Sequence, residues 1–529
     1  SPPNDSGRRA DGVHRLLPAS VSTRSGAGAF ACSGTACALL CDLLGSLQAD
    51  EPSGECAACV PAEWNDGNPI QASRVRMKEG RSGMTAGEGT TSVRTEPDDG
   101  NAAGAGVRQE SRFGRLPSLI VAVTVIGVLI GVAAGLLTLM LYGVEHLFLG
   151  YVESGDMPGP FGVPAWRRAL SVFVGLSIAG VAWWLLRTRT ARVPSVKKAV
   201  NGDRMPAWQT VVHVLLQIFI VGTGASIGRE VAPRELGALF GQRFARWIRL
   251  GPRDTRMLVA ITAAAGLAGV YNAPLAGTFF ATEILLADIS AETVSLAFGC
   301  SALASWTASL VKGTHVFYAI GQVDGLFTSD LIGFAVVAGL VCGLFGALFR
   351  RGSSWAESHQ SSGTAILWTL PLAGLLTGVT ALWAPQVMGN GRATAQMGFS
   401  SALEWSVIPV LALSFVVKAV VTLLTIRAGA SGGVLQPGIA LGASMGALLG
   451  VAWIMMFHTN AIGVYALVGA CALLAASQKA PLMAMCLVME LADAPLNLFV
   501  PVGCAVAVAG LVSCVLSPRL SAWHPLERR

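Results

Sequence analysis

Charged side chains are scarce in this chain. Asp, Glu, Lys and Arg together make up 13% of the 529 residues, whereas hydrophobic residues make up 53%. Soluble globular domains carry about 25% charged residues, so this composition excludes an ordinary soluble protein. The net charge of +6 is small for a chain of this length, and it gives no indication that the protein binds nucleic acid.

Side chains that bind metals are also few, with 7 histidines and 11 cysteines. Cys56 and Cys59 have the spacing of half a zinc site, but no second Cys or His pair completes it. An odd number of cysteines precedes residue 60, which argues against a framework of disulfides. We therefore predict no metal site and no cofactor.

Long apolar segments, in contrast, are abundant. From about Leu116 onward, runs close to the ~20 residues that span a bilayer follow one another, and Met257–Leu286 is one of them. Several runs are short or broken by Gly and Pro, which membrane proteins tolerate where protein or a water-filled cavity covers the backbone. The sequence predicts an all-α polytopic membrane protein. The polar residues 1–114 lack sustained periodicity, and we expect a disordered extension outside the native fold.

One short motif, Gly228-Arg-Glu-Val-Ala-Pro233, lies inside a long apolar region. An ionisable pair at membrane depth is costly and therefore points to a functional site. The glycines before the motif and Pro233 indicate a helix that begins inside the membrane, and the unpaired N–H groups at such a helix start attract anions. The motif predicts an anion pathway. A buried ion pair between Arg229 and Glu230 is the structural alternative.

Two motifs occur twice, in the same order. The first is echoed by Gly432-Gly-Val-Leu-Gln-Pro437, and Asn272-Ala-Pro-Leu is echoed by Lys479-Ala-Pro-Leu. In both copies a glutamate, Glu283 or Glu490, follows the proline of the second motif by nine residues (283 − 274 = 9; 490 − 481 = 9).

This duplication is typical of transporters that are built from two repeats and whose interrupted helices meet near the membrane midplane. We divide the membrane part accordingly into a first repeat, a connection, a second repeat and a short tail, at 115–312, 313–328, 329–523 and 524–529.

With these motifs the chain resembles the CLC family of chloride channels and proton-coupled chloride antiporters. The family's Gly-Arg-Glu-Gly-Pro segment matches at Gly228, its Gly-Gly-Ile-Phe-Ala-Pro segment at Gly432, and its Asn-Ala-Pro-Leu-Ala-Gly segment at Asn272. The resemblance covers most of residues 115–520. It implies two inverted repeats of short, tilted, broken helices, and a homodimer with one pore in each subunit.

The resemblance also assigns roles. Glu230 would be the gate, because its carboxylate competes with anions for the outer binding site and moves aside when it is protonated or displaced. Backbone N–H groups would hold the anion, so apolar side chains are compatible with this role. The anion-binding residues that the resemblance implies are Gly228, Arg229, Glu230, Val231, Gly433, Val434, Leu435 and Val193.

Three positions depart from the family pattern. The carboxylate that relays protons on the inner side of the antiporters aligns with Ile284, which carries no proton. A serine that contacts chloride aligns with Ala191, and the tyrosine that closes the central site has no counterpart. The candidates for a proton path are Glu283, His213 and Glu490. Helix capping or pairing with a cation is the alternative for the glutamates, and hydrogen-bonded packing is the alternative for the histidine.

We therefore expect transport of chloride or a related monovalent anion across a prokaryotic plasma membrane, channel-like or weakly coupled to protons. A proton-coupled chloride or fluoride antiporter is the alternative, because family members that export fluoride also lack the serine and the tyrosine. A membrane-embedded hydrolase is a remote third class, since Ser226 lies in a Gly-x-Ser-x-Gly pattern. That pattern supports a nucleophile only within an α/β sheet.

Overall fold

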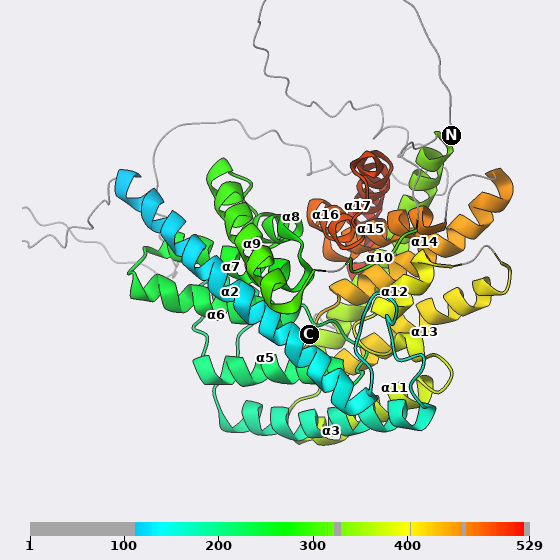
Figure 1. Cartoon of the computed structure of the whole chain (residues 1–529), viewed down its shortest axis with the longest axis horizontal. Coiled ribbons are helices and arrows are strands. Elements are labelled where there is room, and N and C mark those ends of the chain that lie inside the picture. The colour runs from blue at the N-terminus through cyan, green and yellow to red at the C-terminus, as the bar shows by residue number, and fades with distance from the viewer. Residues whose placement is uncertain (1–111, 315, 322–328, 402–403, 458–461, 523–529) are drawn as a thin grey trace, which may run out of the picture. The chain divides into compact units, whose positions relative to one another are not determined.

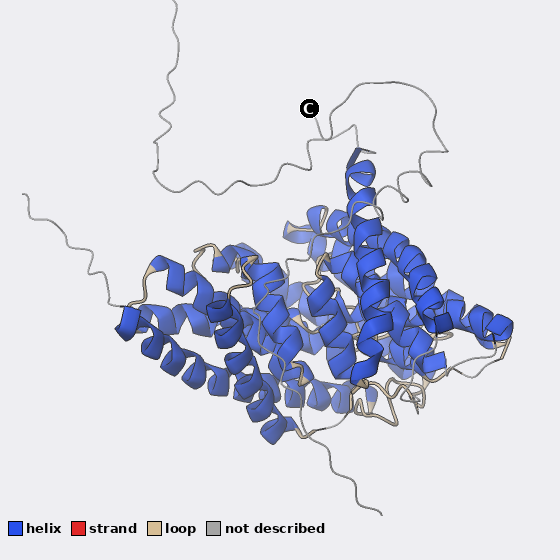
Figure 2. Ribbon diagram, turned by 90° about the horizontal axis from the view of Figure 1, so that it is seen from above, coloured by secondary structure: helices blue, strands red, loops and turns tan. Residues whose placement is uncertain are grey.

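The computed structural model describes residues 112–314, 316–321, 329–401, 404–457 and 462–522. Within these ranges the chain forms 16 α-helices and no β-strand beyond one isolated bridge (Figures 1 and 2). The all-α prediction is confirmed. The predicted extension up to residue 111, which includes Cys56 and Cys59, and the predicted tail at 524–529 lie outside the described residues.

Eight α-helices precede the predicted connection. They are α2 (Arg112–Leu149), α3 (Ala165–Arg189), α4 (Val196–Val200), α5 (Ala207–Gly222), α6 (Val231–Trp247), α7 (Pro252–Tyr271), α8 (Pro274–Phe279) and α9 (Ala291–Lys312). A π-helical segment, Phe280–Leu286, continues α8.

Eight more follow the connection. They are α10 (Ser329–Ser358), α11 (Ile366–Thr380), α12 (Arg392–Phe399), α13 (Val407–Arg427), α14 (Leu435–Phe457), α15 (Ile462–Gln478), α16 (Pro481–Leu491) and α17 (Phe499–Ala522).

The same packing pattern occurs on both sides of the connection. In the first half α2 packs against α7 and α9, and α6 packs against α7; in the second half α10 packs against α15 and α17, and α14 packs against α15. In Figure 1, α2 crosses the first group diagonally. The halves meet where α3 packs against α11 and α8 packs against α16.

Eight of the described helices are long and apolar enough to cross a membrane. The expected continuous run Met257–Leu286 is not among them, because α7 ends at Tyr271 and α8 begins at Pro274. Between them Asn272 adopts a left-handed conformation with φ 53°. Ala273, the residue before Pro274, has φ −124°, because a residue before proline is biased away from the helical region. The helix α9 is one of the eight.

Two glutamates join the halves by capping each other's broken helices. Glu490 of α16 accepts hydrogen bonds from the backbone N–H groups of Leu275 and Ala276, both at 2.8 Å, at the beginning of α8. Glu283 accepts from Leu482 at 3.3 Å and Met483 at 2.9 Å, at the beginning of α16. Each carboxylate thus satisfies helix-start donors that the bilayer could not.

Removing either cap should destabilise the protein. We expect Glu283→Ala and Glu490→Ala each to lower the free energy of unfolding by about 1–2 kcal/mol, the usual cost of a lost helix cap. Thermal unfolding in detergent measures this, with Glu357→Ala on the exposed end of α10 as the control. Equal melting temperatures for all three variants would contradict the capping role.

Candidate functional site

The site is built where the two broken segments meet. Gly228 donates its backbone N–H to the carbonyl of Gly433, and Gly433 donates to the carbonyl of Gly228, both at 2.8 Å in an antiparallel bridge. Helix α6 begins three residues after Gly228, and α14 begins two residues after Gly433. The positive ends of two helices therefore lie beside the same point inside the protein.

The side chain of Glu230 lies at this point. Its Oε1 accepts a 2.6 Å hydrogen bond from the backbone N–H of Leu435, the first residue of α14. A Cβ on Gly228 or Gly433 would overlap the carboxylate, so both glycines provide the room that it fills. Glu230 is completely buried, and its Oε2 has no hydrogen-bond partner among the described residues. A carboxylate thus accepts from a backbone amide that the family resemblance assigned to anion binding.

Arg229 points elsewhere, so the alternative of an Arg229–Glu230 ion pair is wrong. Its guanidinium lies 3.8 Å from the carboxylate of Glu153 and over the rings of Tyr271 and Phe317, at 5.6 and 5.5 Å. Arg229 is 2% exposed, and two of its nitrogens, Nε and Nη1, have no acceptor among the described residues.

Glu153, in the loop after α2, is the centre of a buried charge cluster. Its carboxylate contacts Arg392 at 3.1 Å and accepts from Asn390 at 3.3 Å, in addition to Arg229. Its backbone N–H donates to Glu145 at 2.9 Å. Sequence analysis missed this cluster because its members come from segments far apart in the chain, without a shared motif.

Two neutral donors near Glu230 were also missed. The hydroxyl of Tyr271 faces Glu230, Arg229 and Gln436 and has no hydrogen-bond partner among the described residues. The Nε2 of Gln436 likewise lacks an acceptor, while its Oε1 accepts from Tyr318 at 2.6 Å. Buried donors without partners are uncommon and indicate a site that water or an ion completes.

Ser226 lies beside a buried lysine of α13. Lys418 is completely buried and donates to Ser226 Oγ at 3.0 Å and to the carbonyls of Val387 and Gly389 at 3.0 and 2.8 Å. Ser226 Oγ also lies 3.2 Å from the hydroxyl of Thr422. No strand precedes Ser226, so the nucleophile elbow that the hydrolase hypothesis requires is absent from this described segment.

His213 of α5 belongs to a second polar group, beside the first turns of α6 beyond Glu230. Trp183 donates to its Nδ1 at 3.0 Å, and its Nε2 lies 3.8 Å from Glu235. Gln217 donates to the same carboxylate oxygen at 2.7 Å. Glu235 follows Glu230 by five residues, and it is a buried carboxylate that sequence analysis did not select, although it adjoins the selected motif.

The remaining predicted positions fall in two groups. Val231 begins α6, and Val434 directly precedes α14, so both lie beside the Glu230 carboxylate. Val193 lies between α3 and α4, where its half-buried side chain packs against the apolar core. Among the described residues, no hydrogen bond joins its segment to Glu230 or Leu435. Over these same ranges, no three His, Cys, Asp or Glu side chains are grouped for a metal.

Paired broken helices around a buried carboxylate define a membrane transport protein. The family described as voltage gated chloride channel matches residues 174–514 of this chain. The voltage-gated ClC-type chloride channel ClcB of Salmonella typhimurium is 31% identical over 386 residues, which cover 70% of this chain and 89% of that protein. ClcB of Escherichia coli is 29% identical over 385 residues, with the same coverage.

Solved structures share the fold. A slow cyanobacterial Cl⁻/H⁺ antiporter superposes with a TM-score of 0.65 at 22% identity, covering 78% of this chain and 99% of that one. A CLC-type fluoride/proton antiporter gives 0.61 at 24% identity, covering 77% and 98%.

The chain belongs to the voltage-gated chloride channel (CLC) family. It is a multi-pass integral membrane protein of bacterial type with the CLC fold, it transports anions, and it is not an enzyme. The hydrolase hypothesis is therefore wrong.

The charge cluster yields a stability prediction. Glu153→Gln leaves Arg229 and Arg392 buried without their shared carboxylate, and we expect a loss of about 3–5 kcal/mol of folding free energy, because unpaired buried charges are costly. Asp156→Asn, an exposed change in the same loop, is the control and should have little effect. Denaturation followed by size-exclusion chromatography measures both, and similar stability of the two variants would refute the role of Glu153.

Proposed function

We propose that this protein transports chloride or a related monovalent anion through a pathway that Glu230 gates, channel-like or weakly coupled to protons. The supporting observation is the hydrogen bond from Leu435 N–H to Glu230 Oε1. The carboxylate imitates an anion at the start of α14, so a permeating anion must displace it. Protonation also weakens its hold, because a neutral carboxyl competes poorly for an amide donor.

The surroundings of Glu230 favour a negative charge. Lys418 and Arg234 lie close enough to act on it electrostatically, and the starts of α6 and α14 add their partial positive charge. The hydroxyl of Tyr271 and the Nε2 of Gln436 lack partners among the described residues, so both are available to donate neutral hydrogen bonds nearby. We propose that these two side chains compensate for the missing serine and tyrosine, at a different place along the pathway.

The coupling of anion transport to proton transport requires a protonatable side chain in addition to Glu230. Position 284 has no carboxylate, and Glu283 is engaged as a helix cap, as is Glu490. Among the described residues, His213 and Glu235 form a further protonatable pair close to α6, and this pair favours the alternative of a proton-coupled antiporter. We propose this pair as the inner proton site if coupling is present.

The family resemblance further implies a homodimer, and we propose one, to be checked by the mass of the purified protein in detergent. Chloride is the proposed substrate because the relatives cited above are named chloride channels. Fluoride remains the second candidate, since one structural neighbour is a fluoride/proton antiporter.

The deciding experiment uses purified protein in liposomes and records anion efflux together with internal pH. Chloride efflux without proton movement supports the channel-like proposal. Chloride efflux with opposed proton movement supports the antiporter. Fluoride efflux without chloride efflux would overturn the choice of ion.

Removal of the gate has a defined consequence. In Glu230→Ala the Leu435 amide is left to the anion alone, so we expect efflux that no longer rises as the pH falls. The wild-type protein should conduct faster at acidic pH, because a neutral carboxyl competes poorly with an anion for an amide donor. Flux assays over a pH series measure the difference, with Asp156→Asn, an exposed change in the loop after α2, as the control. A variant that keeps the wild-type pH dependence would show that Glu230 is not the gate.

Proton movement, where present, should depend on Glu235. We expect Glu235→Gln to abolish proton transport and to leave chloride efflux within about threefold of wild type, because glutamine keeps the shape and the Gln217 contact but carries no proton. Glu283→Gln is the matched control, a similar change on a carboxylate that caps a helix. Coupled transport in Glu235→Gln, or its loss only in Glu283→Gln, would exclude the His213–Glu235 pair.

A further inference from the structure

A cavity of about 860 Å³ lies away from the Glu230 site, at the opposite end of α6. The end of α4 and the following loop, the last turn of α6 and the first turns of α7 form its wall. Four arginines line it, and none of the lining residues is acidic. They are Arg204, Arg246, Arg253 and Arg256.

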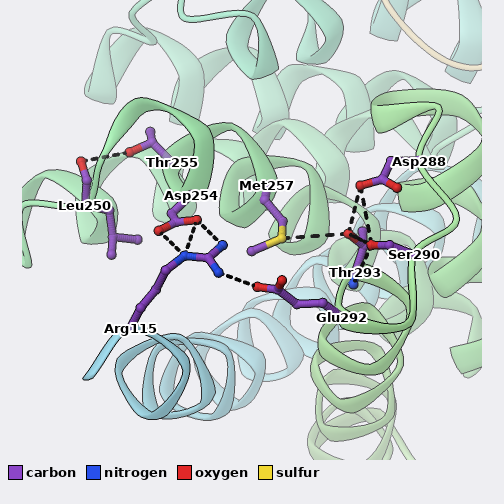
Figure 3. A network of polar contacts seen from close by, with 9 residues as sticks. All are labelled: Arg115, Leu250, Asp254, Thr255, Met257, Asp288, Ser290, Glu292 and Thr293. Atoms are coloured by element: carbon purple, nitrogen blue, oxygen red, sulfur yellow. Dashed lines mark hydrogen bonds and ion pairs between the residues drawn. The ribbon is translucent and has the colours of Figure 1, made fainter. Parts of the chain in front are cut away.

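Two carboxylates adjoin these arginines in sequence. Asp203, next to Arg204, is exposed, does not line the cavity and forms no ion pair among the described residues. The other is already engaged. Asp254, between Arg253 and the next lining residue Thr255, accepts from Arg115 Nε at 2.8 and 3.0 Å (Figure 3). The same Arg115 also pairs with Glu292 of α9 at 2.9 Å. Within the described ranges, none of the four lining arginines forms an ion pair with a carboxylate. The cavity therefore holds uncompensated positive charge.

The wall of the cavity is held in place by a buried side chain. Gln242, 7% exposed, donates from Nε2 to the carbonyls of Ala199 and Asp203 at 3.0 and 2.7 Å, and its Oε1 accepts from Met205 N–H at 3.0 Å. These bonds fix the loop that carries Arg204 against α6. The arginines thus project from a preformed frame.

Two tryptophans mark the depth of the cavity in the membrane. Trp208 and Trp247 are 57% and 76% exposed, and each lies close in sequence to a lining arginine. Exposed tryptophans gather at membrane–water interfaces, and basic loops gather on the cytoplasmic side. The cavity therefore opens at the level of the cytoplasmic lipid headgroups.

We infer that this cavity binds a phosphate-bearing anion, and that an anionic phospholipid headgroup supplies it. Guanidinium groups match phosphate oxygens in charge and in paired hydrogen-bond geometry. Basic pockets between membrane helices on the cytoplasmic side bind such headgroups. The positive-inside tendency accounts for arginines in these loops, but not for four of them around one cavity without a carboxylate. The inference does not depend on the ion that the protein transports.

The test compares two double variants with the same loss of charge. Arg253→Gln/Arg256→Gln changes the cavity, whereas Arg243→Gln/Arg249→Gln changes exposed arginines of the same region that do not line it. Each protein is placed in bilayers of phosphatidylcholine with a minor share of cardiolipin, extracted, and weighed by native mass spectrometry. We expect the cavity variant to retain cardiolipin about 25-fold less well, because each surface arginine contributes about fivefold. The control variant should retain it like wild type.

A second arm separates the lipid from a soluble ligand. The delipidated proteins are heated with and without inorganic phosphate. Stabilisation by phosphate that the cavity variant alone loses, with equal cardiolipin retention in all proteins, would keep the phosphate site but overturn the lipid as its source. Equal retention and equal stabilisation in both variants, or equal loss in both, would overturn the site itself. The melting temperature of each variant without added phosphate verifies that it is folded.

Discussion

The backbone pairing between Gly228 and Gly433 is the constraint on which the rest of the site depends. Two reciprocal 2.8 Å hydrogen bonds hold two chain segments, about two hundred residues apart, in a fixed antiparallel register. This register brings the start of α14 within reach of the residue that precedes α6. Because neither glycine has a side chain, the space between the two helix starts is filled by the Glu230 carboxylate.

The cationic groups around this pairing form their ion pairs and hydrogen bonds with groups other than the Glu230 carboxylate. The guanidinium of Arg229 is drawn toward Glu153, which it shares with Arg392, so no direct ion pair restrains Glu230. Lys418 is held by two carbonyls and a hydroxyl, and it acts on Glu230 through space. A carboxylate held by one amide hydrogen bond, without an ion pair, is the arrangement that the proposed displacement by an anion requires.

The sequence predicted the helical class, the membrane location and the family, because apolar length and the Gly/Pro motifs are local signals. The Gly-Arg-Glu motif singled out Glu230, the nine-residue spacing singled out Glu283 and Glu490 with capping as one of their possible roles, and the family resemblance singled out Leu435. The sequence could not assign the partners. For Arg229 the sequence left two roles open, an ion pair with Glu230 or a place in the anion pathway. The carboxylate that Arg229 contacts belongs to Glu153, which lies in a loop without a motif. Burial and missing hydrogen-bond partners distinguish Tyr271 and Gln436, and burial distinguishes Glu235. Both properties depend on tertiary contacts, which the sequence does not show.

The exchange of caps between the halves has a consequence for how the protein is made. Helix α8 is synthesised and inserted about two hundred residues before its capping carboxylate on α16 exists, since Glu490 bonds the amides of Leu275 and Ala276. Until Glu490 has been synthesised, these two amides lack the acceptor that they have in the complete fold. The first half therefore cannot reach its final hydrogen bonding without the second.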